Sequence, residues 1–317
     1  GIHMISTCHN INATPHCPLQ RSIVKLSVLI LLLILHSQSH ASDGSQGAAS
    51  AGWKSSVTAA FAWQGDTNID SGGEFSVNRG VLQFDSRRLV GSRLFTGITL
   101  GYEQDDYKFS SLSAQPWNDI RTLQFGLSLR YLATDKWSLF GLPLLRYSSE
   151  KGKDLSDGRE YGLLAGASYR FSENLTLGPG FGVISGIGGE EDIFPILLVN
   201  WKITDTVSVE TGRGLAASRG PGLALKWKPA SQWELSLAAR YEKSRFRLAT
   251  DNNIGEDRSV PVLLTASWRH NRHFSVTGFT GFETAGQLSL ENSTGDEIES
   301  LEYDTAPLAG LLARFSF

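Results

Sequence analysis

Leu308-Ala309-Gly310-Leu311-Leu312-Ala313-Arg314-Phe315-Ser316-Phe317, the last ten residues, alternate between two kinds of side chain. Every second residue counted back from Phe317 is apolar, whereas the residues between them are mostly polar or small. A period of two places successive side chains on opposite faces of an extended strand. The stretch therefore predicts a β-strand with one apolar face and one mostly polar face.

The same alternation recurs along the chain from Trp53 onward. We predict fourteen strands, with twelve as the alternative. Their ranges are 53–63, 74–88, 94–103, 121–131, 137–147, 161–171, 175–183, 193–203, 207–211, 223–228, 233–242, 260–269, 274–283 and 308–317.

The connections between these strands alternate in length. Short turns at 134–136, 172–174, 204–205, 229–231 and 270–272 separate longer links, and aromatic residues mark the strand ends beside the turns. The longer links are 104–120, 148–160, 186–192, 212–222, 249–259 and 284–307. Short turns on one side, long loops on the other and aromatic girdles are typical of outer-membrane barrels. The predicted fold is all-β, a transmembrane antiparallel up-and-down β-barrel over residues 53–317.

The N-terminal region has the layout of an export signal. Arg21 and Lys25 precede the apolar run 26–35, which polar residues and Ser39-His40-Ala41 follow. This order of charge, apolar core and small residues is that of a cleaved signal peptide. We therefore expect a signal peptide over 1–41, in which residues 1–20 are an atypical upstream extension. A disordered lead-in over 42–52 should follow, and the expected location is the bacterial outer membrane.

Composition excludes several classes of function. Both cysteines, Cys8 and Cys17, precede the expected cleavage, so residues 42–317 offer no disulfide or cysteine metal site. Removal of two basic residues leaves 27 basic and 32 acidic groups, a net charge of −5, which argues against nucleic acid as a partner. The histidines at 270 and 273 share a short turn without a partner carboxylate. We expect no cofactor, no metal and no enzymatic activity.

Three stretches of the C-terminal half carry a family resemblance. They are Ile193-Phe194-Pro195-Ile196-Leu197-Leu198-Val199-Asn200-Trp201-Lys202-Ile203-Thr204-Asp205, Arg245-Phe246-Arg247-Leu248 and Asn253-Ile254-Gly255-Glu256-Asp257-Arg258-Ser259-Val260-Pro261-Val262. The chain resembles a family of uncharacterised proteobacterial outer-membrane β-barrel proteins. That resemblance implies the fold and the location, but no activity.

The strand face opposite the apolar one carries charges that must avoid lipid, because Arg or Lys at mid-membrane costs about 2–4 kcal/mol. We predict that these groups line a pore, and the alternative is that they form ion-paired plugs. Inward glycines at 178–182 favour open space. The predicted pore-lining residues are Arg130, Arg170, Lys202, Glu210, Lys226, Glu234, Arg240, Glu242, Arg269, Glu283 and Arg314.

These features predict a passive channel for small hydrophilic solutes. The alternative is a non-conducting structural barrel, or one that binds lipid or a partner at its surface. Lys243, Arg245 and Arg247 are expected to face outward, where they would bind lipopolysaccharide phosphates. The expected partners are outer-membrane lipid, lipopolysaccharide and, through the terminal Phe317, the barrel assembly machinery.

Overall fold

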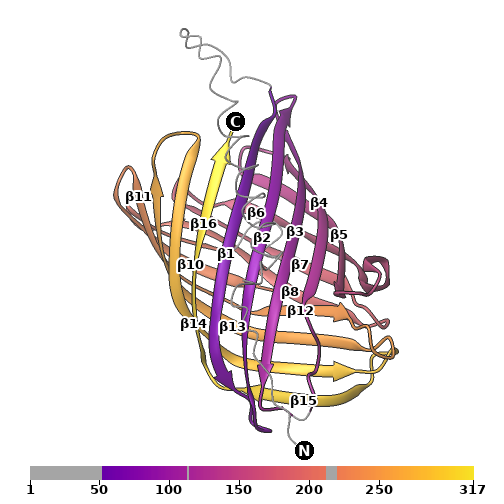
Figure 1. The fold of residues 1–317 in the computed structure, drawn as a ribbon. Helices are drawn as coiled ribbons and strands as arrows, with labels where there is room; N and C mark the ends of the chain where they lie inside the picture. The colour runs from indigo at the N-terminus through magenta and orange to yellow at the C-terminus, as the bar shows by residue number, and fades with distance from the viewer. Residues whose placement is uncertain (1–51, 113, 212–219) are drawn as a thin grey trace, which may run out of the picture. The chain divides into compact units, whose positions relative to one another are not determined.

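The computed structural model describes residues 52–112, 114–211 and 220–317. The expected signal peptide and nearly all of the expected lead-in lie outside these residues. From Ala51 onward the chain forms one compact unit, which is an antiparallel β-barrel (Figure 1). Within the described residues no helix is long and apolar enough to cross a membrane.

The described residues form sixteen strands and one short 3-10 helix. They are β1 (Lys54–Asn68), β2 (Glu74–Val90), β3 (Leu94–Ser110), β4 (Ile120–Leu132), β5 (Trp137–Glu150), η1 (Leu155–Gly158), β6 (Arg159–Arg170), β7 (Leu175–Ser185), β8 (Glu191–Lys202), β9 (Val207–Thr211), β10 (Gly222–Ala230), β11 (Trp233–Arg240), β12 (Glu242–Arg247), β13 (Ile254–Arg269), β14 (Phe274–Glu291), β15 (Glu297–Tyr303) and β16 (Ala306–Ser316).

The wall of the barrel contains fourteen strands, as the alternation predicts. β12 continues β11 in the same register against β13, and β15 pairs only with β14 in the named ladders, so two of the sixteen add no wall position. The barrel closes where β16 pairs with β1, with Thr58 opposite Arg314. Backbone hydrogen bonds of 3.0 and 2.8 Å join Ser55 and Phe317 at the end of this seam. Closure leaves the sheet without free edges along this side.

The strands on the long-loop side extend further than the alternation indicates. Strands occupy part of the link predicted over 104–120 and most of those over 249–259 and 284–307, because β3 runs to Ser110, β13 begins at Ile254 and β14 reaches Glu291. β15 lies wholly within the last of these links. This correction concerns the end of the barrel where the candidate site lies.

Some of these extensions fold across the mouth of the barrel. We call β12, residues 254–259 of β13, residues 286–291 of β14 and β15 the infolded sheet, and Figure 1 shows these strands running across the view behind β1–β3. The bend follows a register shift between Arg258 and Val260, opposite Ala285 with a φ of 51°. Pro261 lies next to this shift and cannot donate to the ladder, and bulges of this kind bend strands.

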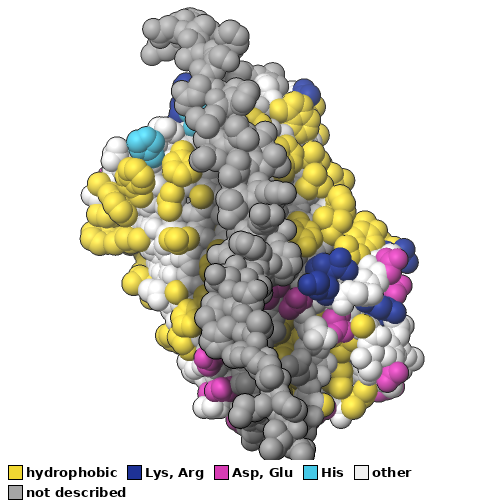
Figure 2. Space-filling view, in the orientation of Figure 1, with side chains coloured by type: hydrophobic (Ala, Val, Ile, Leu, Met, Phe, Trp, Pro, Cys, Tyr) yellow, Lys and Arg dark blue, Asp and Glu magenta, His cyan; other side chains and the backbone are white. Residues whose placement is uncertain are grey.

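The outer face of the wall is apolar. Leu264, Leu237 and Leu311 are 57, 53 and 62% exposed, and the girdle residues Trp137 and Trp233 are also exposed. Figure 2 shows hydrophobic side chains over much of the visible wall, with the visible acidic side chains in the lower half of the view. An apolar band flanked by aromatic residues is the surface that a barrel presents to lipid.

A matched pair of arginine substitutions should distinguish the two faces. Leu237 faces outward, whereas its neighbour Ala238 lies on the opposite face beside Ala224 and Leu263. We expect Leu237→Arg to lower the free energy of unfolding in lipid vesicles by about 2–4 kcal/mol, the cost of arginine at mid-membrane. Ala238→Arg should cost less, because its guanidinium reaches the interior near Glu234 and Glu242. Equal losses in urea titrations of the two variants would contradict the assignment of the faces.

Candidate functional site

The inner face near the short turns is hydrophilic. Hydroxyl pairs bridge neighbouring strands: Ser138 with Ser168 at 2.8 Å, Ser236 with Thr265 at 2.7 Å. Lys226 lies 3.3 Å from Glu210 and 3.6 Å from Glu234 on the adjacent strands. The lysine and both glutamates keep about a quarter of their side-chain surface exposed, so solvent reaches them. These charges pair along the wall and do not cross the barrel. We call this surface the short-turn lining.

The eleven predicted pore-lining residues all lie on the strand face opposite the apolar belt. Arg314 donates a hydrogen bond of 2.8 Å to Ser56, and Arg170 donates to the backbone carbonyl of Asp135. Glu283 differs from the other predicted pore-lining residues because only 2% of its surface is exposed. These residues lie on the inward face that the alternating sequence pattern predicts for them. Their role in conduction stays a prediction.

Deeper in the barrel, Glu283 belongs to a buried polar cluster that the sequence pattern did not single out. Arg79 contacts Glu283 at 3.1 Å and Asp257 at 3.5 Å, and it donates to Gln64 at 3.0 Å. The Tyr107 hydroxyl donates to Asp257 at 2.8 Å. The cluster joins β1, β2, β3, β13 and β14, so at this depth the inner charges form a plug between walls. Arg79 lies at an inward-facing position of the alternating pattern in its strand. This position is the signal in the sequence that could have identified it.

One face of the infolded sheet packs against the inner wall through apolar side chains. Phe246 lies with its ring centroid 5.0 Å from that of Trp117, and Phe75 lies 5.6 Å from Phe109 and 4.9 Å from Tyr303. We call this buried set the apolar seal; its members are Ile69, Phe75, Val77, Tyr107, Phe109, Trp117, Ile120, Phe246, Leu248, Leu288 and Tyr303. It fills the long-loop end of the barrel beside β1–β4.

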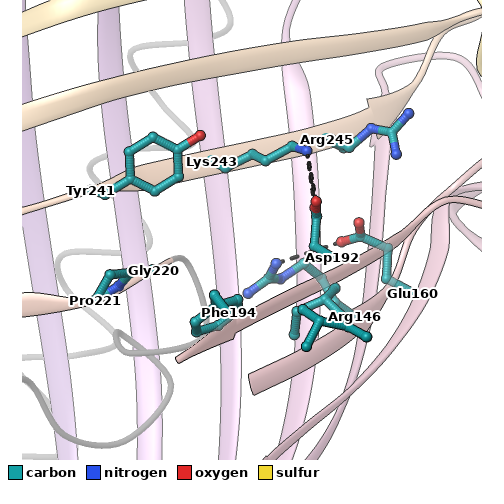
Figure 3. A pocket seen from close by; sticks show the side chains of 11 residues that line it. Arg146, Glu160, Asp192, Phe194, Gly220, Pro221, Tyr241, Lys243 and Arg245 are labelled. Carbon is teal, nitrogen blue, oxygen red and sulfur yellow. Dashed lines mark hydrogen bonds and ion pairs between the residues drawn. The ribbon is translucent and has the colours of Figure 1, made fainter. Parts of the chain in front are cut away.

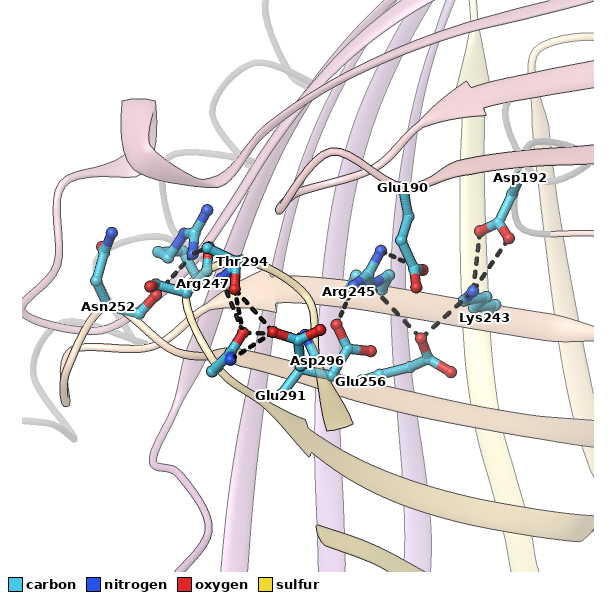
Figure 4. A network of polar contacts seen from close by, with 12 residues as sticks. Glu190, Asp192, Lys243, Arg245, Arg247, Asn252, Glu256, Glu291, Thr294 and Asp296 are labelled. Atoms are coloured by element: carbon cyan, nitrogen blue, oxygen red, sulfur yellow. Dashed lines mark hydrogen bonds and ion pairs between the residues drawn. The ribbon is translucent and has the colours of Figure 1, made fainter. Parts of the chain in front are cut away.

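The opposite face of the infolded sheet carries Lys243, Arg245 and Arg247, and their expected outward, lipid-level position is wrong. Arg245 is only 2% exposed and contacts Glu190 at 2.9 Å, Glu256 at 3.5 Å and Glu291 (Figure 4). The parity is as predicted, since Arg245 and Phe246 point to opposite faces. The chain bends after β11, however, and the face that would point outward in a straight strand turns towards the β7–β8 connection. A cluster enclosed in this way presents no open basic surface to lipopolysaccharide.

Lys243 and Arg247 complete this ionic contact. Lys243 lies 2.9 Å from Asp192 and 3.4 Å from Glu256, and Arg247 donates to the carbonyls of Asn252 and Asp157 at 2.6 and 3.3 Å. We call the contacts of Lys243 and Arg245 with Glu190, Asp192, Glu256 and Glu291 the ionic seal. In the exposed turn beside it, hydrogen bonds from Asn292 and Thr294 hold the pKa of Asp296 below its usual value.

A pocket of about 150 Å³ lies beside the ionic seal, between β8 and β12 (Figure 3). Its polar side is formed by Arg146 and Glu160, which are 3.5 Å apart, and by the pair Lys243–Asp192. Arg146 and Glu160 lie at inward parity on or next to predicted strands, so the pattern could have indicated them. Asp192 lies within the link predicted over 186–192, whereas the structure places it in β8.

The other side of the pocket is apolar. Ile184 and Phe194 line it and belong to a second apolar cluster with Leu142, Leu144 and Leu164. This cluster corrects the expectation that glycines at 178–182 border open space. A Cβ at Gly182 would collide with the Phe194 ring, so the glycine makes room for that ring.

Comparisons with known proteins bear on the architecture only. No protein-family model and no curated protein sequence matches the chain, so the family resemblance stays a prediction. Among solved structures, an outer membrane channel from Pseudomonas putida F1 is 11% identical with a TM-score of 0.49, covering 88% of this chain and 100% of that one. The P. putida toluene transporter TodX is 10% identical with a TM-score of 0.45, covering 84% and 90%. The translocator domain of the autotransporter NalP from Neisseria meningitidis is 14% identical with a TM-score of 0.38, covering 96% and 100%.

All three similarities are too low for functional transfer, and the barrel assignment rests on the strand pairing of the chain itself. The described residues contain no group of three or more His, Cys, Asp and Glu side chains that could hold a metal ion.

Proposed function

We propose that this protein is a bacterial outer-membrane barrel that acts as a passive channel for small hydrophilic solutes. The observation that carries this proposal is the contrast between the two faces of the wall. The outer face is apolar, whereas the short-turn lining consists of hydroxyl pairs and charges that solvent reaches. A polar lumen inside an apolar cylinder is the arrangement of barrels that conduct water and solutes.

The apolar and ionic seals define a closed state in this proposal. Between them they occupy both faces of the infolded sheet at the long-loop end. A solute can therefore cross the long-loop end only if the infolded sheet moves. Otherwise the solute has to leave through the side of the barrel. A barrel that conducts rarely at rest, and more often when a seal is weakened, fits this geometry.

The two seals also favour a second candidate, a non-conducting surface barrel. In that case the buried cluster around Arg79 and both seals are permanent filling. Lipid or a partner would then bind at the outer wall or at the exposed acidic residues Glu297 and Glu299 of β15. Conductance separates the two candidates directly.

The test uses the purified full chain in planar bilayers, together with liposome swelling by sugars of graded size. We expect brief openings of the unaltered chain and a several-fold higher open fraction for Asp192→Asn, which removes a charge from the ionic seal. Tyr161→Phe, which changes an exposed side chain of the apolar belt, is the matched control and should behave like the parent. Silence of all three proteins, with folding verified by heat-dependent migration in gels, would favour the non-conducting barrel.

A further inference from the structure

A basic residue lies near the end of every wall strand that runs towards the short turns. Seven strands arrive at that end of the barrel, and each carries a lysine or arginine of inward-facing parity within its last four residues. These strands alternate with the strands that leave the short turns, so the basic residues are spread evenly around the closed wall. We call them the basic ring; its members are Arg87 in β2, Arg130 in β4, Arg170 in β6, Lys202 in β8, Lys228 in β10, Arg269 in β13 and Arg314 in β16.

Strand register shows that the ring faces the interior. Trp268, which precedes Arg269, pairs with the girdle residue Trp233 on the outer face. Arg269 therefore points inward, because successive side chains of a strand alternate between the two faces. Ser275 shares this inner face and lies opposite Arg269 in one ladder of β14 and opposite Arg314 in the other.

The carboxylates on the inner face of this half of the barrel do not balance the ring. Glu210 and Glu234 contact Lys226, and Glu234 also contacts Lys228 at 3.4 Å. Asp85 accepts its hydrogen bonds from neutral side chains. The ring and Lys226 together exceed these three carboxylates by five charges. Within the described residues, five ring members form no ion pair shorter than 4 Å: Arg87, Arg170, Lys202, Arg269 and Arg314.

The spacing of the ring lets its charges act together. Neighbouring members lie two strands apart, which is about 10 Å along the wall. This separation is close to the Debye length of about 8–10 Å at physiological ionic strength, so their potentials overlap. Rings of arginine and lysine side chains favour anions in pores.

Hydroxyl groups beside the cations narrow the class of anion. Thr176 lies opposite Arg170, Ser208 lies opposite Lys202, and Ser275 lies between two arginines. A carboxylate or phosphate accepts several hydrogen bonds at once, one from the cation and another from the neighbouring hydroxyl. Five of the seven members are arginines, whose planar fork matches these two groups.

We infer that the basic ring selects small organic oxyanions, carboxylates and phosphates, as the solutes of the barrel. This inference rests on the proposed channel and specifies its solute class. The other end of the barrel has the opposite sign: residues 273–313 contain no lysine or arginine, and Glu297, Glu299 and Glu302 of β15 are exposed. That end supplies an internal control.

Cysteine labelling of the folded full chain in neutral detergent tests the inference, with Cys8→Ser and Cys17→Ser as background. Ser275→Cys reports the ring and Ser300→Cys the acidic end. An anionic and a cationic methanethiosulfonate are compared, and each rate is divided by the rate of that reagent with a free thiol. Heat-dependent migration in gels verifies the fold of every variant.

We expect Ser275→Cys to prefer the anionic reagent by about fivefold or more at low salt, since overlapping charges raise the local concentration of counter-ions. The preference should approach one in 1 M salt, where the Debye length is about 3 Å. Ser300→Cys should prefer the cationic reagent. Glucose 6-phosphate should slow anionic labelling of Ser275→Cys more than potassium chloride of equal ionic strength, and uncharged glucose should not slow it.

Two triple variants make the test specific to the inner face. Arg170→Gln/Lys202→Gln/Arg269→Gln removes three ring charges and should lower the anionic preference at least twofold. Its matched control, Arg93→Gln/Lys136→Gln/Arg272→Gln, removes three cations from the short turns of the same rim and should retain most of the preference.

Three results would overturn the inference: a cationic preference at Ser275→Cys, equal losses in the two triple variants, or equal slowing by glucose 6-phosphate and chloride. None of these measurements requires conduction. A silent barrel with the expected labelling would remove the channel and keep the ring as an oxyanion-binding surface. A conducting barrel whose reversal potential in a salt gradient shows cation selectivity would keep the channel and overturn the solute class.

Discussion

Arg245→Met is expected to lower the free energy of unfolding by about 3–5 kcal/mol, the usual cost of removing one partner from a buried ion pair. Arg245 is 2% exposed, and its partners Glu256 and Glu291 have side chains that are 7 and 9% exposed. Methionine fills part of the space but leaves both carboxylates enclosed without this cation. Urea titration of the folded barrel, followed by tryptophan fluorescence, measures the loss.

Two further variants make this expectation specific. Arg258 is only half-buried, and it lies on the same face of the adjacent β13 as Glu256. Within the described residues it forms no ion pair shorter than 4 Å. Arg258→Met should cost less than about 1 kcal/mol, as substitutions away from buried networks do. The triple variant Arg245→Met/Glu256→Gln/Glu291→Gln should recover part of the loss, because it removes the buried charges together. Equal losses for Arg245→Met and Arg258→Met would contradict the ionic seal.

The lipid-spanning part of the fold was predictable because lipid imposes a simple rule on it. Each strand there has one face in hydrocarbon, so the period of two is clear; β9, for example, begins at Val207, as predicted. The seam between β1 and β16 follows from the same rule, since a barrel must close.

The infolded sheet was not predictable from this rule. Residues 254–259 alternate Ile254, Glu256 and Arg258 with Gly255, Asp257 and Ser259. Both faces of this segment contact protein, one through the buried Asp257 and the other through Glu256, so neither face needs to be uniformly apolar. Alternation fails wherever a strand leaves the lipid, and the sequence pattern therefore predicts a loop over this segment.

The candidate site shows the same division. Parity correctly separates Arg245 from Phe246, but it cannot reveal which surroundings each face meets after a bend. The pocket combines side chains of β5, β6, β7, β8 and β12, which are far apart in the sequence, so alternation along single strands could not predict it. Predicting its polar pair, Arg146 and Glu160, would have required the register of β5 against β6. That register places these two residues opposite each other.

Phe246→Ala is expected to destabilise the barrel about as strongly as Arg245→Met, but through the opposite face of the infolded sheet. Phe246 is 1% exposed, its ring contacts Trp117 and Tyr107, and the absence of a side chain at Gly255 makes room for it. Truncation of a buried phenylalanine costs about 3–5 kcal/mol, from lost burial and from the cavity that remains. Phe282→Ala is the matched control, because that residue is 44% exposed on the apolar belt and its removal opens no interior cavity.

The two seal variants together test whether the infolded sheet moves as a unit. Arg245 and Phe246 are consecutive residues on opposite faces of β12, so they hold the same strand to different walls. If the sheet swings as a whole, weakening either seal should raise the open fraction in planar bilayers several-fold, and Phe282→Ala should not. An increase for Arg245→Met alone would place the moving boundary at the ionic seal, next to the pocket between β8 and β12. No increase for either variant, with the expected losses of stability confirmed, would mean that the mouth is permanently filled.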